Sequence, residues 1–125
     1  MDRKKLDSLV NKIIGIAIDT HKILGSGFTE KIYQEALAYD FLQRRINYEK
    51  EKLSKIRYKN QFLGTQKINF LIEGELILEL KSVKEIGEVH LAQVLSYLKA
   101  ANKKSGLILN FAEARLGIKR VAYNF

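Results

Sequence analysis

A carboxylate and an ammonium group lie two residues apart in the alternating segment 75–82. Alternate side chains of an extended strand share a face, so Glu79 and Lys81 are expected side by side, with Cα atoms about 6.6 Å apart. Such a pair suits metal-assisted phosphodiester cleavage: the carboxylate holds Mg²⁺, and the lysine orients water or stabilises phosphate charge. The alternative is the solvent-exposed face of an amphipathic strand, because Glu-x-Lys is a common tripeptide.

A carboxylate metal site needs a second oxygen ligand from a neighbouring strand. A tight hairpin turn predicted at residues 73–74 places Asn69 about level with Glu79. Alternation puts Asn69 on the face opposite Ile68 and Phe70. An amide oxygen is an uncharged, weak ligand for Mg²⁺. The alternative for Asn69 is a polar residue on the solvent-facing side of the strand.

Helical spacing predicts that His90, Gln93 and Tyr97 share one face of a helix over 88–101. Gln93 could hydrogen-bond a water or a phosphate beside Lys81. We expect His90 to lie at the surface or at the start of the helix, and Tyr97 to take part in packing.

Glu30 begins another helix after a glycine-rich turn, with Thr29 as the expected cap and Tyr33 one turn further on the same side. An acid in a first helical turn is favoured by about 0.3–1 kcal/mol without any catalytic role. Glu30 becomes a metal ligand only if the fold brings it to Glu79.

The element order ααβββαββ follows from the change between helical and alternating periodicity. It predicts one α/β (α+β) domain over residues 1–125, with an N-terminal helix within 1–24 and a core over 27–125. The predicted helices cover residues 3–24, 29–45 and 88–101, and the predicted strands cover 48–58, 62–72, 75–82, 105–111 and 118–125.

The 125-residue chain has no cysteine and a net charge of +8. The absence of cysteine excludes disulfide scaffolds, thiolate zinc sites and cysteine nucleophiles. We find no phosphate-binding loop, membrane span or signal peptide, and expect a cytoplasmic protein without a membrane partner. The positive charge suggests a polyanionic partner. The basic stretch expected to bind nucleic-acid phosphates comprises Arg44, Arg45, Lys50, Lys52, Lys55, Arg57 and Lys59.

Five motifs, in this order along the chain, resemble those of the bacterial and archaeal GxxExxY proteins, a compact branch of the PD-(D/E)XK nuclease superfamily. They are Gly27–Tyr33, Ile77–Ser82, His90–Leu98, Gly106–Phe111 and Ile118–Arg120.

The resemblance implies a helix-flanked mixed β-sheet and a nuclease that depends on Mg²⁺ or Mn²⁺. It makes Glu79 the metal-binding acid, Lys81 the catalytic lysine and Gln93 the helix glutamine found in several branches. Glu30 corresponds to the helix glutamate, an additional metal ligand.

Asn69 departs from this pattern, because the family usually has Asp there. The substitution removes one negative charge, so we expect weaker metal binding and slower chemistry. Three explanations stay open: a natural degenerate nuclease fold, an engineered Asp→Asn change, or a weak site in which Glu30, Glu79 and a neighbour such as Glu73 suffice.

Two functions compete at this point. The first is an impaired nuclease acting on DNA or RNA. The second is a catalytically inactive module that binds nucleic acid or a protein partner; a homodimer through a sheet edge or the first helix is a third, weaker possibility.

Overall fold

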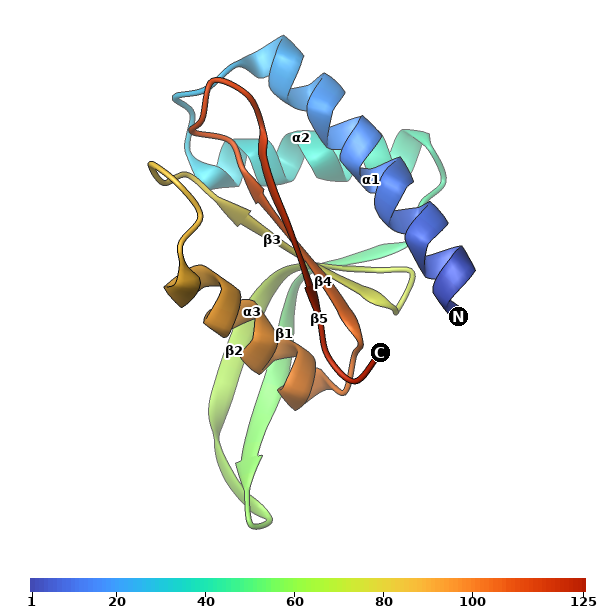
Figure 1. Ribbon diagram of the computed structural model, residues 1–125, viewed down its shortest axis with the longest axis vertical. Helices are drawn as coiled ribbons and strands as arrows, with labels where there is room; N and C mark the ends of the chain where they lie inside the picture. Colours follow the sequence, from blue (N-terminus) through green and yellow to red (C-terminus); the bar gives the residue numbers. More distant parts are fainter.

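A five-stranded mixed sheet forms the centre of the molecule (Figure 1). The strands lie in chain order, and all neighbours are antiparallel except β3 and β4, which are parallel and are joined through α3. The computed structural model describes residues 1–125. Its elements are α1 (Arg3–Leu24), α2 (Glu30–Gln43), β1 (Tyr48–Tyr58), β2 (Gln61–Ile72), β3 (Leu76–Lys81), α3 (Glu88–Ala101), β4 (Ser105–Asn110) and β5 (Gly117–Ala122).

Helices cover both faces of the sheet. α1 and α2 pack on one face, over a cluster of 19 buried residues that includes Leu76, Leu78 and Leu80 of β3. α3 packs on the other face, over a cluster of seven buried residues that includes Ile77 of β3 and Ile108 of β4. β3 is therefore buried on both faces. None of the three helices combines the length and hydrophobicity needed to cross a membrane.

The predicted single α+β domain and its element order are confirmed, with ends that agree within three residues. α1 ends as expected at Gly25, whose φ of 74° suits glycine and whose N–H donates to the His21 carbonyl. α2 begins after Thr29, but the Thr29 side chain makes no capping hydrogen bond. The Tyr33 hydroxyl instead accepts from the Phe28 N–H, one residue before the cap.

The face alternation of β2 breaks at Asn69. Ile68 packs in the cluster under α3, whereas Phe70 packs in the cluster under α1 and α2. The prediction that both lie on the face opposite Asn69 is therefore wrong. Glu51, the residue of β1 level with Asn69, has a φ of 54° and takes no part in the ladder. This local twist turns the Asn69 side chain out of the regular alternation.

β1 and β2 continue beyond the body of the domain as a two-stranded arm (Figure 1). The arm reverses at Lys59 and Asn60, both with positive φ, which confirms the predicted turn. The pairing register shifts by one residue between Ile56 and Arg57. Such a bulge bends a ribbon and strengthens its twist.

Gly106 allows α3 to lie directly on β4, because a Cβ atom there would lie 2.6 Å from Cγ1 of Val94. We expect Gly106→Ala to lower the free energy of unfolding by about 1–3 kcal/mol through overpacking. Gly15→Ala is the matched control, because it adds a methyl group in open space within α1. It should raise stability by up to about 1 kcal/mol. Urea unfolding measures both, and equal effects would contradict the close packing.

Candidate functional site

Glu79 and Lys81 form an ion pair at the end of β3 that is largely withdrawn from water. Oε2 of Glu79 lies 4.0 Å from Nζ of Lys81, whose side chain is 16% exposed. Glu79 as a whole is 4% exposed. The alternative of a solvent-exposed strand face is therefore wrong, because α3 covers this side of β3. Burial of a charged pair is costly unless other groups compensate it.

Burial raises the pKa of Glu79, and the negative charge of Glu30 raises it further. The ammonium of Lys81, the hydroxyl of Tyr97 and the backbone N–H of Asn69 act in the opposite direction. Burial and the charge of Glu79 also raise the pKa of Tyr97, so this phenol stays protonated and serves as a donor. Tyr97 thus packs against the sheet, as expected, and also stabilises the carboxylate.

The Asn69 amide uses both of its ends. Its Oδ1 accepts from the Leu80 N–H at 2.9 Å, and its Nδ2 donates to Oε1 of Gln34 at 2.8 Å. A backbone N–H can only donate, so Leu80 fixes the orientation of the Asn69 amide, which in turn fixes that of Gln34. Nε2 of Gln34 is left buried without a partner. Asn69 is half-buried between α2 and β3, so the alternative of a solvent-facing residue is wrong.

Sequence reasoning missed Gln34, which is 3% exposed. The available signal was its position four residues after Glu30 in α2, on the same helical face. α2 therefore presents an exposed carboxylate and a buried amide toward β3.

Tyr33 fixes the start of α2 and hence the position of Glu30. Its hydroxyl donates to the Gly25 carbonyl at 2.5 Å and accepts from the Phe28 N–H at 3.2 Å. Its ring stacks on Phe111 at the end of β4, with centroids 4.2 Å apart. Tyr33 is fully buried while Glu30 is exposed. Of these two neighbours on one side of the helix, Tyr33 therefore has a structural role, whereas Glu30 does not.

The oxygen ligands for a divalent metal do not form a complete set. Glu30 is near enough to raise the pKa of Glu79, but no three acidic or histidine side chains converge anywhere in the chain. Glu73 does not join them, because it lies in the β2–β3 turn and accepts from the Asn47 N–H. Two carboxylates and the engaged amide of Asn69 fall one charge short of a typical carboxylate site.

Two further residues singled out in the sequence, His90 and Gln93, lie in the first two turns of α3. Gln93 is half-buried on α3, and its side chain makes no hydrogen bond. His90 lies at the start of α3, as expected, where its Nδ1 accepts from the Gly87 N–H at 2.9 Å. Asn110, which sequence reasoning did not single out as functional, is fully buried and hydrogen-bonds the N–H and carbonyl of Val83. It fixes the chain directly after Lys81.

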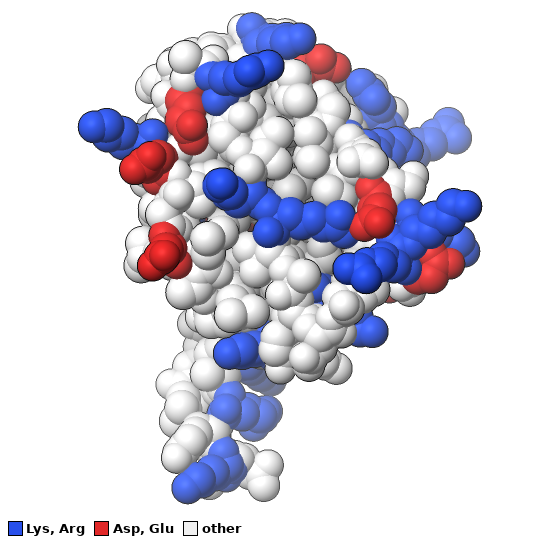
Figure 2. All heavy atoms as spheres, viewed as in Figure 1, with Lys and Arg blue, Asp and Glu red and all other residues white.

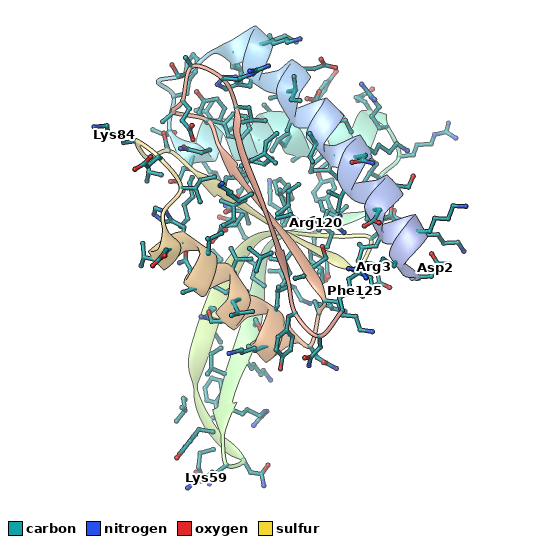
Figure 3. All side chains as sticks on the ribbon, in the orientation of Figure 1. Asp2, Arg3, Lys59, Lys84, Arg120 and Phe125 are labelled. Carbon is teal, nitrogen blue, oxygen red and sulfur yellow. The ribbon has the colours of Figure 1, made fainter.

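The predicted basic residues do not form one surface. Arg44 lines a hollow between α1 and α2, and Arg45 lies in the turn after α2. Lys50 pairs with Glu35 at 2.6 Å. Lys59 lies at the tip of the arm (Figure 3). A groove between β1 and α3 is lined by the other three, Lys52, Lys55 and Arg57.

The model of the PD-(D/E)XK nuclease superfamily matches residues 7–121. This chain belongs to that superfamily. The crystal structure of SSO0001 is similar in fold, with a TM-score of 0.60 and 17% sequence identity over 76% of this chain. The match covers 50% of SSO0001, so this chain spans about half of its length. A search of curated proteins gave no match.

The buried carboxylate of this superfamily member makes stability depend on pH. Between the ordinary pKa of glutamate, 4.5, and the raised pKa of Glu79, the folded state binds more protons than the unfolded chain. The free energy of unfolding therefore falls as pH rises through this window. We expect the wild-type value minus that of Glu79→Gln to decrease from pH 4 toward pH 8 in urea titrations. An increase would mean that the pKa of Glu79 is lowered.

The role of Tyr33 is tested by Tyr33→Phe, which keeps the ring on Phe111 and removes both hydrogen bonds of the hydroxyl. We expect a loss of about 1–3 kcal/mol in the free energy of unfolding. Tyr39→Phe changes an exposed tyrosine of the same helix and should stay within about 0.5 kcal/mol of wild type. Equal losses in the two variants would refute the structural role of Tyr33.

Proposed function

We propose that this chain is a nucleic-acid-binding nuclease domain, of the GxxExxY type, whose Mg²⁺- or Mn²⁺-dependent cleavage of DNA or RNA is impaired by Asn69. The observation that carries the proposal is the buried Glu79–Lys81 pair, with Glu30 close by. The superfamily membership supports a phosphodiester substrate. The missing carboxylate is the reason to expect weak metal affinity.

The side chains of the candidate site could contact a phosphodiester without any change in the fold. The Lys81 side chain is 16% exposed, and its ammonium would stabilise negative charge on a phosphate oxygen. The free amide of Gln93 would orient a water or the nucleic-acid backbone. Tyr97 and Asn110 are positioning residues. Tyr97 stabilises the Glu79 carboxylate, and Asn110 holds the chain after Lys81.

The decisive change is Asn69→Asp, which places a carboxylate between the Leu80 N–H and Gln34, next to the strand that carries Glu79. Gln34 can turn its amide so that the unpartnered Nε2 donates to the new carboxylate. We expect a few millimolar Mn²⁺ to raise the Tm of Asn69→Asp by at least about 4 °C, because binding to the folded state stabilises it. Wild type should shift by less than about 1 °C. Differential scanning fluorimetry with EDTA and Ca²⁺ arms measures this shift.

Cleavage is measured in parallel on labelled single-stranded and duplex DNA and RNA. Asn69→Asp should cleave at least tenfold faster than wild type, and Asn69→Asp/Glu79→Ala should not cleave, which controls for contaminating nucleases. Cleavage that survives in the double variant would overturn the assignment of Glu79. Absence of both cleavage and a Mn²⁺ shift in Asn69→Asp would overturn the proposal.

A binding module without catalysis is the second candidate, and the engaged Asn69 amide favours it. Both ends of that amide serve the protein's own hydrogen bonds. In this case nucleic acid binds without divalent metal, and its affinity falls as salt rises.

A further inference from the structure

The arm of β1 and β2 carries charge of one sign. From Lys52 to Ile72 the chain contains no Asp or Glu, although this is about a sixth of its length. Figure 2 shows basic side chains without acidic ones on the part of the arm visible below the body. The basic residues of this segment are Lys52, Lys55, Arg57, Lys59 and Lys67.

The groove between this arm and α3 adds basic residues that the sequence analysis did not single out. Lys99 of α3 and Lys103, two residues after α3, line it together with Lys55 and Arg57. Its volume is about 1050 Å³. Glu49 is its only acidic lining residue and already pairs with Lys52 at 3.2 Å. The uncompensated lysines and arginine make this groove attractive to a polyanion.

The floor of the groove holds a polar atom without a partner. Gln66 of β2 donates from Nε2 to the Ser96 hydroxyl at 3.0 Å, and its Oε1 is buried without a hydrogen bond. Buried polar atoms normally have a partner. The unsatisfied Oε1 gains a partner only if the Gln66 side chain turns toward a donor in the groove, such as the exocyclic amine of a base.

The tip of the arm exposes apolar and aromatic side chains. Tyr58 is 58% exposed and Phe62 57%, and Leu63, which follows Phe62 in the chain, is exposed too. Phe62 pairs with Arg57 and Tyr58 with Gln61, so the two rings lie on opposite faces of the ribbon at its tip. The ammonium of Lys59 lies 5.2 Å from the centre of the Tyr58 ring. Exposed aromatic rings among basic side chains are the combination on which unpaired bases stack. A second copy of the chain is a poorer occupant, because two arms would bring like charges together.

We propose that the arm and the groove bind single-stranded nucleic acid, with phosphates at Lys99 and Lys103 and bases on Tyr58 and Phe62. This surface is separate from the Glu79 site: Tyr97 contacts Glu79, and Lys99, two residues later, points about 200° away around α3. The inference rests on the proposed nucleic-acid partner but not on cleavage. The arm would bind single-stranded nucleic acid whether or not the protein cleaves it.

The test is fluorescence anisotropy in EDTA, with a labelled 20-nucleotide single strand and the same sequence as a duplex. Lys99→Gln/Lys103→Gln should weaken single-strand binding at least tenfold. It should also flatten the slope of log K against log salt by about 1.4, roughly 0.7 for each lost phosphate contact. Lys4→Gln/Lys5→Gln removes the same charge from α1 and should change Kd less than twofold. Equal effects of the two pairs would overturn the proposal.

Tyr58→Ala/Phe62→Ala tests the stacking. These positions are exposed, so the variant should unfold in urea as wild type does. Single-strand affinity should fall at least fivefold and duplex affinity less than twofold. Equal losses on both probes would overturn the single-strand assignment. A wild-type dimer in light scattering that this variant abolishes would instead make the tip a protein interface.

Glu79→Ala separates this proposal from the proposed nuclease activity. It removes a buried carboxylate of β3 that does not line the groove, and it leaves the arm intact. Single-strand affinity should match wild type within twofold. Loss of binding in this variant while it stays folded would place the nucleic acid at Glu79 and overturn the separate surface.

Discussion

The burial of β3 on both faces is the constraint from which the site follows. A strand between two helical layers has no wet side, so its one carboxylate, Glu79, enters the interior with a raised pKa. Each neighbour then compensates a charge that water would otherwise solvate: Lys81 by opposite charge, Tyr97 by its hydroxyl and Asn69 by its backbone N–H. A perturbed acid beside a lysine is the arrangement expected of catalytic groups.

The second layer brings the remaining parts to that strand. α2 begins where Tyr33 fixes the glycine-rich connection against Phe111, and its first two turns carry Glu30 and Gln34 toward β2 and β3. The Gly27–Tyr33 motif therefore combines a tyrosine with a structural role and an exposed acid. The stacking of Tyr33 on Phe111, directly after β4, connects the geometry of α2 to that of the parallel strand pair.

Periodicity and turn residues were enough to predict the elements and their order, because β3, α3 and β4 each keep one pattern throughout. The mixed sheet flanked by helices was implied by the family resemblance. The proximity of Glu79 and Lys81 could also be predicted, because the alternation of side chains along a strand depends only on the local sequence. The burial of the pair and the contact of Asn69 with Gln34 were not, because they depend on which helix covers which face. The break in side-chain alternation at Asn69 could not be predicted for a similar reason. It is caused by the irregular Glu51 on the neighbouring strand, and no pattern within β2 indicates it.

The side-chain amides of Asn69 and Gln34 continue a chain of hydrogen bonds that begins at the Leu80 N–H. The orientation of the Gln34 amide in this chain, and so which of its ends stays unpaired, can be reversed. With Asn at position 69, the spare group at its far end is a donor. With Asp there, rotation of the Gln34 amide would make the spare group an acceptor while packing stays the same. Codons for Asn and Asp differ by a single base, so one mutational step reverses the direction of these hydrogen bonds without rebuilding the core.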